Sequence, residues 1–183
     1  MTMPFGESGD TEIGRRPVDR AAPRIEVDLT RQELAFFDGG AEIRRYPVST
    51  ARNGPGERQN SECTPRGRHV VRARIGAGLP LGAVLRGRRP TGEIYSASLA
   101  RDNPDRDWIL TRILWLSGCE PGRNRLGDVD SMRRFIYIHG TPDDEPMGEP
   151  RSHGCIRMRN ADIAELFDKV PAGTIVDIRE GQG

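Results

Sequence analysis

Cys155 is the residue whose type and setting best suit covalent chemistry. It lies in the segment Ser152-His153-Gly154-Cys155-Ile156-Arg157. A cysteine attacks a carbonyl carbon as the thiolate, so it needs a nearby base and an electropositive setting. The glycine before it lets the backbone approach a substrate and aim N–H groups at an oxyanion. The alternative is a buried structural cysteine, which is the commoner fate of this residue type.

His139 is the candidate base for such a nucleophile. It follows the apolar run 135–138, which predicts a short strand, and precedes the flexible Gly140. The end of a strand presents a side chain rigidly, and a cysteine with a histidine is a recurrent nucleophile–base pair. Taken alone, His139 would more often be a packing or loop histidine. The chain has only three histidines, and two of them, His139 and His153, fall near Cys155, which favours the catalytic interpretation.

His153 and Arg157 each lie two positions from Cys155. In an extended segment their side chains would point to the same side as the cysteine. His153 would either tune the site or hold the turn by hydrogen bonds. Arg157 would either bind a substrate carboxylate and raise the local positive potential, or form a structural ion pair. The sequence leaves both choices open.

Zinc chemistry is an alternative, because His139, His153, Cys155 and Cys119 are all zinc-ligand types. No C-x-x-C or H-x-x-x-H spacing is present, so we expect no metal and no other cofactor. Cys63 and Cys119 lie in no comparable glycine-rich turn and are predicted to be inert thiols. The odd count of three cysteines also argues against a disulfide framework.

The composition limits the class of protein. With 183 residues, 35% of them hydrophobic and 30% charged, the chain fits one globular domain with a real core. No stretch approaches the roughly 20 apolar residues that a membrane-spanning helix needs. The net charge is +1, and the densest basic cluster, Arg86, Arg88 and Arg89, has no interleaved aromatic residues. We therefore expect a solvated loop there, and neither a nucleic-acid partner nor a transmembrane segment.

Residues 1–22 are rich in glycine, proline and charge, which predicts a flexible leader before a domain over 23–183. This leader lacks the apolar core of a secretory signal. The sequence as it stands therefore favours the cytoplasm. A protein from which an export signal had been removed would instead belong in the periplasm or the cell wall.

The pattern within the domain predicts a mainly β fold. Alternating apolar residues predict a strand over 24–29, and Asp38-Gly39-Gly40 predicts a hairpin between strands over 32–37 and 41–48. After a loop over 50–67, further strands are expected up to about residue 74 and over 108–116, 135–138 and 174–178.

One helix is expected, over 160–170. Asn160 would cap it, and Pro171 would help to end it. The residues predicted to share its buried face are Ile163, Leu166, Phe167 and Val170.

Two stretches, 76–104 and 118–132, show little periodicity and are predicted to be long loops. Loops of this length are uncommon and often cover functional sites. We therefore expect the excursion over 77–107 to lie near Cys155.

These residues together resemble a known family. The segment IYIHGTPDD followed by SHGCIRM is similar to the signature of the YkuD-type L,D-transpeptidase catalytic domain. The segments IEVDLTRQELAFFDGG, YPVST and TPRG are similar to the family's opening strands and to its entry into the next strand. The resemblance spans about 24–178 and is weakest between 76 and 108. It implies a β-sandwich or barrel with one helix in the C-terminal half and long active-site loops.

The resemblance also implies roles for residues. Cys155 would be the nucleophile and His139 the general base, with the carbonyl of Gly140 orienting the imidazole. Backbone N–H groups around Gly154 and Cys155 would hold the oxyanion, and Ser152 and His153 would support the site. The spacer over 140–151 is shorter than in many relatives, which would reshape the substrate entrance.

The implied donor is a tetrapeptide stem of peptidoglycan. The nucleophile would attack the carbonyl at the L-centre of diaminopimelate and expel D-alanine. An amine acceptor would make the protein a transpeptidase, whereas water would make it an L,D-carboxypeptidase for peptidoglycan recycling. Outside this chemistry, a non-catalytic murein-binding domain and a metal-dependent amidase are the alternatives.

Overall fold

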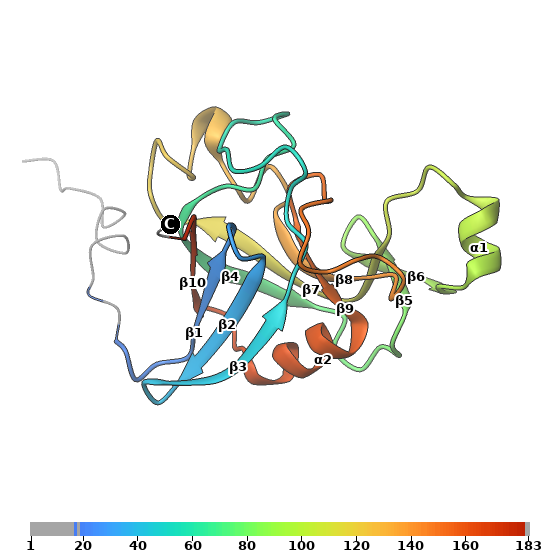
Figure 1. The fold of residues 1–183 in the computed structure, drawn as a ribbon, viewed down its shortest axis with the longest axis horizontal. Coiled ribbons are helices and arrows are strands. Elements are labelled where there is room, and N and C mark those ends of the chain that lie inside the picture. Colours follow the sequence, from blue (N-terminus) through green and yellow to red (C-terminus); the bar gives the residue numbers. More distant parts are fainter. Residues whose placement is uncertain (1–16, 18, 182–183) are drawn as a thin grey trace, which may run out of the picture.

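The computed structural model describes residue 17 and residues 19–181, and one curled sheet of ten strands dominates it (Figure 1). The mainly β class is confirmed. The strands are β1 (Arg24–Asp28), β2 (Glu33–Asp38), β3 (Ala41–Pro47), β4 (Gly67–Ile75), β5 (Ala83–Arg86), β6 (Arg89–Ile94), β7 (Ile109–Gly118), β8 (Tyr137–Thr141), β9 (Ile156–Arg159) and β10 (Ile175–Arg179). The helical elements are α1 (Ala97–Asp102), the short 3₁₀ turn η2 (Gly127–Val129) and α2 (Asn160–Lys169).

The long strand β7 joins the parts of the sheet. It pairs antiparallel with β4, β5 and β8. The order across the sheet is β3-β2-β1-β10-β4-β7-β5-β6, while β8 branches from β7 and β9 pairs with β8. The pairs β1–β10 and β8–β9 are parallel. The β8–β9 pair matters most for function, because the candidate residues lie on it and just before it.

The N-terminal strands follow the predicted alternation. Ile25 and Val27 of β1 are fully buried, and β2 and β3 form the expected antiparallel hairpin. Gly39 and Gly40 turn the chain with φ of 57° and 85°, a left-handed conformation that glycine adopts without steric cost. The hairpin prediction is confirmed.

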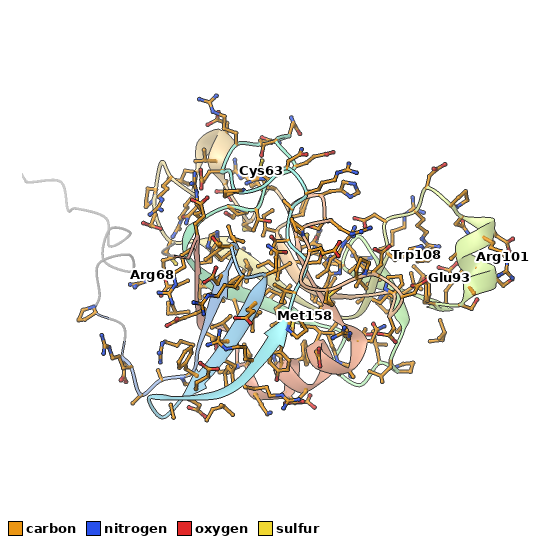
Figure 2. All side chains as sticks on the ribbon, in the orientation of Figure 1. Cys63, Arg68, Glu93, Arg101, Trp108 and Met158 are labelled. Atoms are coloured by element: carbon orange, nitrogen blue, oxygen red, sulfur yellow. The ribbon has the colours of Figure 1, made fainter. Side chains whose placement is uncertain are left out.

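Helix α2 packs against β7, β8 and β9, and Met158 of β9 lies beside it (Figure 2). The four residues predicted to share its inner face are all buried: Ile163, Leu166, Phe167 and Val170. The prediction that Asn160 caps the helix is wrong, since the capping position is Arg159, whose side chain makes no cap hydrogen bond. The Asn160 amide instead turns inward and donates to Thr141 O at 3.0 Å. The Asn160 side chain therefore bonds a buried carbonyl at the end of β8 and does not cap its own helix.

The stretch 76–104 is not a plain loop, which corrects the prediction. It contains the β5–β6 hairpin and the helix α1. The pattern gave no signal because β5 has only four residues, β6 is mostly exposed and α1 buries no residue. Figure 2 shows Glu93, Arg101 and Trp108 on this projecting excursion.

The strand β9 was also missed. The pattern predicts no strand between Cys155 and the helix, but Ile156–Arg159 forms one. Ile156 and Met158 are fully buried. Four residues are too few for alternation to be read in a sequence, so the parallel pairing with β8 decides this strand.

Most of the leader predicted over 1–22 lies outside the described residues. Within the part that is described, Ala22 N donates to Asp19 O, and Ala21 O accepts from Gly39 N at 3.0 Å. The last residues of this segment therefore contact the β2–β3 hairpin. None of the helices in the described ranges is both long and apolar enough to cross a membrane.

Candidate active site

The register of β8 and β9 places the predicted residues on one face of the sheet. His139 pairs with Arg157, and Ile138 pairs with Ile156. Since side chains alternate along a strand, Tyr137 and His139 of β8 face the same side. Cys155 and Arg157 face that side too, because Arg157 is paired with His139. The intervening apolar residues enter the main core: Ile136, Ile138, Ile156 and Met158. The polar side chains are thereby concentrated on the opposite face.

The Cys155 thiol is held between two backbone groups. Tyr137 N donates to Sγ at 3.3 Å, and the thiol donates to Phe135 O at 3.3 Å. Burial raises the pKa of Cys155 to about 12, while the Tyr137 N–H lowers it. The thiol is therefore protonated at neutral pH and must lose its proton to become a nucleophile.

His139 is 1% exposed, and its Nδ1 lies 2.6 Å from Gly140 O. A carbonyl only accepts, so this contact assigns the proton to Nδ1 and leaves Nε2 with a lone pair. Burial lowers the pKa of His139, which keeps the imidazole neutral. The neutral ring in this tautomer has the form of a general base.

Ser152 holds the turn that carries Cys155. Its hydroxyl donates to Cys155 O at 2.6 Å and accepts from Gly154 N at 3.2 Å. Thr64 Oγ1 donates to Gly154 O at 2.9 Å. The Gly154 N–H thus already has a partner, and the Tyr137 N–H is the donor aimed at the sulfur.

Gly154 has a conformational reason to be glycine. Its φ is +130°, which other residues adopt only with strain. A Cβ at this position would also lie 3.3 Å from Cys63 O. The backbone of the nucleophile turn therefore packs directly against the loop that contains Cys63.

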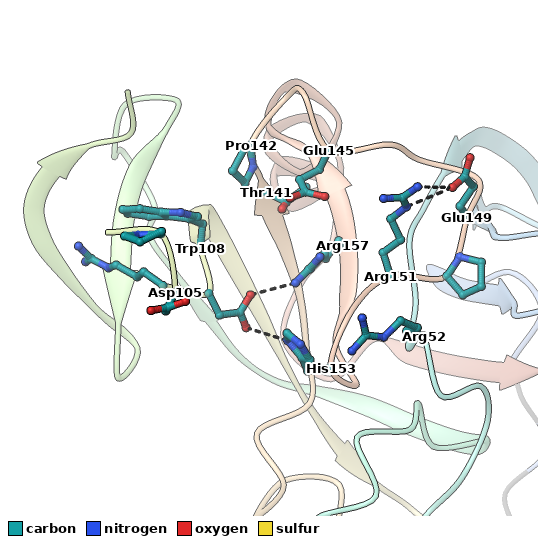
Figure 3. Close-up of a pocket in the computed structure, with 14 residues that line it drawn as sticks. Arg52, Asp105, Trp108, Thr141, Pro142, Glu145, Glu149, Arg151, His153 and Arg157 are labelled. Carbon is teal, nitrogen blue, oxygen red and sulfur yellow. Dashed lines mark hydrogen bonds and ion pairs between the residues drawn. The ribbon is translucent and has the colours of Figure 1, made fainter. Parts of the chain in front are cut away.

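A groove of about 660 Å³ opens beside the nucleophile turn (Figure 3). His153 and Arg157 line it (Figure 3). Asp107 contacts both of them. Asp107 Oδ1 lies 2.9 Å from Arg157 Nη2, and Oδ2 lies 3.9 Å from His153 Nδ1. The excursion that ends at Asp107 therefore lies beside the site, as expected. Arg157 forms an ion pair, one of the two roles that the sequence left open.

Arg88 differs from the solvated-loop prediction made for its cluster. Its guanidinium lies over the rings of Trp115 and Phe135, 4.7 and 5.0 Å from their centroids. It also donates to the Tyr137 hydroxyl at 3.1 Å. Arg86 and Arg89 are exposed, as predicted. The tip of the β5–β6 hairpin thus packs over the aromatic residues next to Cys155.

Sequence reasoning missed three charged residues around the site: Asp107, Arg88 and Arg134. None belongs to a motif, and each reaches the site from a separate loop or turn. No signal in a single sequence could have ranked them above the other charged residues. Their positions around the site depend on packing between segments that are far apart in the chain.

The remaining cysteines and histidine have structural settings. Cys119 is buried, and Cys63 Sγ lies near the carbonyls of Asn53 and Ser61. His69 is fully buried, with Nε2 2.8 Å from Ser131 Oγ. Within the described ranges, no group of three or more His, Cys, Asp or Glu residues is placed to hold a metal ion.

Comparison with known families gives a match over nearly the whole domain. The YkuD model, described as the L,D-transpeptidase catalytic domain, matches residues 22–178. The putative L,D-transpeptidase YkuD of Bacillus licheniformis is 51% identical over 166 residues, which cover 90% of this chain and 70% of that protein.

Other curated relatives match over a short segment. The probable L,D-transpeptidase YbiS of Escherichia coli K12 is 54% identical over 43 residues, 24% of this chain. The matched segment covers only 14% of that relative's length.

Solved structures share the fold. An L,D-transpeptidase from Xylanimonas cellulosilytica superposes with a TM-score of 0.55 at 22% identity, covering 92% of this chain and 66% of that one. One from Mycobacterium smegmatis gives 0.53 at 16% identity, covering 86% and 58%. At these identities the likeness concerns the fold alone.

Proposed function

Because the chain belongs to the YkuD family of L,D-transpeptidase catalytic domains, we propose that it transfers acyl groups of peptidoglycan stem peptides through Cys155. The donor is a tetrapeptide stem. The bond broken joins the L-centre of diaminopimelate to the terminal D-alanine, and the acceptor is an amine. One observation carries the proposal: the β8–β9 register sets Cys155 and His139 on one face, with His139 Nδ1 held by Gly140 O.

The first step is removal of the thiol proton. In the resting geometry the S–H group donates to Phe135 O, and no hydrogen bond between described residues joins it to the imidazole. Rotation about the Cα–Cβ bond of Cys155 releases this contact and turns the proton toward Nε2 of His139. The neutral imidazole takes the proton, and the thiolate attacks.

Acylation then follows with balanced proton transfers. Sγ adds to the carbonyl carbon, and the N–H of Tyr137, which points at the sulfur in the resting state, helps to hold developing negative charge. The imidazolium of His139 returns the proton to the leaving nitrogen of D-alanine. A thioester on Cys155 remains. An acceptor amine attacks it, loses a proton to His139 and releases the thiol.

The charge distribution of the groove favours an amine acceptor that also carries a carboxylate. The formal charges of its lining cancel. The arginines are Arg52, Arg106, Arg151 and Arg157, and the acidic residues are Asp105, Asp107, Glu145 and Glu149. A groove whose formal charges cancel attracts neither a polyanion nor a polycation.

The unpaired members of this groove have both signs. Arg52, Asp105 and Glu145 form no ion pair in the part of the chain that the structure describes. Arg52 can bind a carboxylate and the two acids can bind an ammonium group. An amino-acid head group with both charges is therefore a better match than an uncharged amine.

Water is the competing acceptor, and it would make the protein an L,D-carboxypeptidase. The half-exposed Asp107 and His153 at the groove favour this second candidate, because water reaches the site freely when no acceptor is bound. The two activities share the acyl-enzyme and differ only in the last step.

The deciding experiment incubates the purified protein with a disaccharide-tetrapeptide and follows products by mass spectrometry. Dimers, or exchange of the terminal residue for an added D-amino acid, support the transpeptidase. Loss of D-alanine alone supports the carboxypeptidase. No change in the substrate, with retained binding to murein, would leave only a binding domain.

Cys155→Ala is expected to abolish both activities, because no other thiol is held beside His139. Cys63→Ala is the matched control and retains activity. Full activity of Cys155→Ala would show that the nucleophile is assigned wrongly. Loss of wild-type activity on treatment with a chelator would instead point to a metal-dependent amidase.

A further inference from the structure

Arg134 is a charged residue next to the site that the proposed reaction has not used. Its guanidinium donates to the backbone carbonyls of Gly56, Glu57 and Cys63 at 3.2, 3.0 and 2.6 Å, and to Ser61 Oγ at 3.3 Å. All of these partners are neutral. No carboxylate within the described ranges forms an ion pair with it. Burial lowers the pKa of Arg134, and the nearby Glu57 carboxylate raises it, so its positive charge is only partly compensated.

Arg157 is the second arginine that acts on the Cys155 sulfur, and unlike Arg134 it is in an ion pair. Both Arg157 and Arg134 lower the pKa of the Cys155 thiol, whereas Asp107 raises it. Arg157 is paired with Asp107 at 2.9 Å, so much of its effect is cancelled by the adjacent carboxylate. Arg134 has no carboxylate in ion-pair contact within the described ranges, so less of its effect on the thiol is cancelled.

The position of Arg134 also couples three backbone segments. The following residue, Phe135, supplies the carbonyl that accepts from the thiol. Cys63 O, which Arg134 binds, is the atom that a Cβ on Gly154 would approach. Arg134 therefore connects the 56–63 loop, the 131–135 turn and the nucleophile turn.

These segments are strained, which indicates that something must hold them. Asn60, Glu62 and Phe135 have φ of 62°, 56° and 56°, in the left-handed region. Each such residue costs about 1 kcal/mol or more and persists only where the surroundings hold it. All three line one small hollow together with Arg134 and His153.

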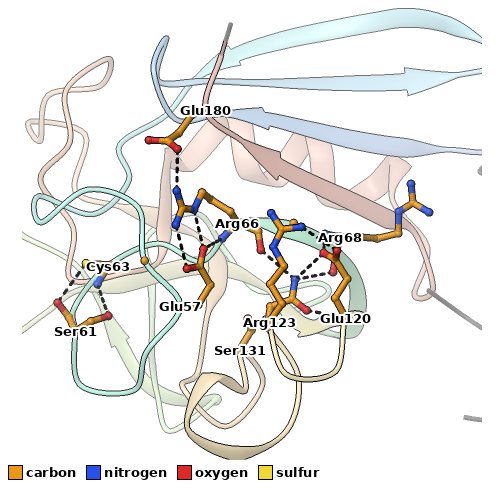
Figure 4. A network of polar contacts seen from close by, with 12 residues as sticks. Glu57, Ser61, Cys63, Arg66, Arg68, Glu120, Arg123, Ser131 and Glu180 are labelled. Carbon is orange, nitrogen blue, oxygen red and sulfur yellow. Dashed lines mark hydrogen bonds and ion pairs between the residues drawn. The ribbon is translucent and has the colours of Figure 1, made fainter. Parts of the chain in front are cut away.

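The 56–63 loop is also held by an ion pair that does not involve Arg134. Glu57 binds Arg66, whose guanidinium also contacts Glu180 at 2.9 Å (Figure 4). The Glu57 carboxylate is therefore engaged away from Arg134, while its backbone carbonyl accepts from Arg134. The Glu57 carboxylate acts on Arg134 through space but is itself held in an ion pair with Arg66.

We propose that Arg134 is a positioning residue for acyl transfer, which holds the loop and turn around Cys155 and supplies positive charge that favours its thiolate. The inference rests on the proposed role of Cys155 as nucleophile. Arg134, Arg157, Asp107 and Tyr137 interact electrostatically with the thiol. Arg134 itself interacts with Cys63, Glu57 and Cys155.

The test measures the thiolate directly, without any peptidoglycan substrate. The full-length protein is treated with iodoacetamide, a neutral reagent whose approach does not depend on nearby charge. The second-order rate of Cys155 alkylation at pH 7.5 is followed by mass spectrometry of the Cys155 peptide. Below the thiol pKa this rate is proportional to the thiolate fraction.

Arg134→Gln is expected to slow alkylation about tenfold, the effect of raising a thiol pKa by one unit. Arg134→Lys keeps the charge and is expected to restore most of the rate. Arg133→Gln is the matched control, because this adjacent arginine is exposed and its side chain forms no ion pair in the described structure. It is expected to react at the wild-type rate.

Two results would overturn the proposal. One is an unchanged alkylation rate in Arg134→Gln, whatever happens to its melting temperature. The other is a rate in Arg134→Lys as low as in Arg134→Gln, which would make the effect purely structural. If Arg134→Gln does not fold, Arg134→Lys alone decides: a wild-type rate despite a lowered melting temperature supports the charge. Activity of Cys155→Ala tests the proposed function separately.

Discussion

At Cys155 and His139, burial acts in opposite directions on the pKa values of the two groups that exchange one proton in the proposed mechanism. Burial raises the pKa of the thiol and lowers that of the imidazole. The resting pair is therefore neutral, and in the proposed mechanism the thiolate–imidazolium pair forms when His139 takes the thiol proton. Residue types and spacing in the sequence are enough to indicate both residues. The groups that balance their proton transfer, Asp107 and Arg134, carried no signal in the sequence.

The pH profile of the acylation step tests this picture of His139. A base must be deprotonated to act, so activity falls as pH drops through the pKa of His139. Because burial lowers that pKa from 6.5, the acid limb of kcat/KM is expected below pH 6.5. Release of D-alanine at a series of pH values measures it. An acid limb above pH 7 would contradict a buried, neutral base.

At the scale of elements, β8, β9 and α2 form one unit around a buried amide. Asn160 Nδ2 donates to Thr141 O at 3.0 Å, and its Oδ1 accepts from the Thr111 hydroxyl. The side chain therefore joins the start of α2 to the end of β8 and to β7. The apolar face of α2 was predictable from the helical spacing of its hydrophobic residues. The inward turn of Asn160 was not, because a polar residue at a helix start is normally read as a cap.

Asn160→Ala is expected to destabilise the fold by about 2 kcal/mol or more, because it leaves buried partners without a hydrogen bond. Urea denaturation followed by fluorescence of the two tryptophans measures the change. Asn103→Ala is the control, since the amide of Asn103 donates to Leu99 O on the projecting helix α1 and not to a partner in the sheet. A similar, small effect of both substitutions would show that the buried network contributes little.

At the scale of the whole molecule, buried histidines couple stability to pH. His69 of β4 bonds the 118–132 loop through Ser131, and burial lowers its pKa to about 4. Between pH 4 and 6.5 the unfolded chain binds a proton that the folded chain does not. Stability is therefore lost as pH falls through this window.

His69→Gln is expected to flatten this dependence. The proton linkage at His69 corresponds to about 3 kcal/mol between pH 6.5 and 4, as an order of magnitude. Free energies of unfolding from urea titrations at several pH values compare the variant with the wild type. Parallel curves across the whole window would show that His69 titrates alike in both states.

Period and turn chemistry in the sequence determined the opening strands, the hairpin at Asp38 and the apolar face of α2. The local segment around Cys155, with His139, determined the candidate chemistry. These features depend on near neighbours in the chain, so a single sequence contains them. The tertiary structure alone decided the short strand β9 and the contents of the excursion before Asp107.

Tertiary structure also decided which charges face the thiol. Asp107 and Arg134 reach Cys155 from segments 48 and 21 residues away in the chain. Neither segment has a periodicity that predicts its course, and opposite charges act only over the short distances that folding creates. The sequence was therefore enough to propose Cys155 and His139 as the reacting pair, whereas the charged groups around them were decided only by the packing of the loops around β8 and β9.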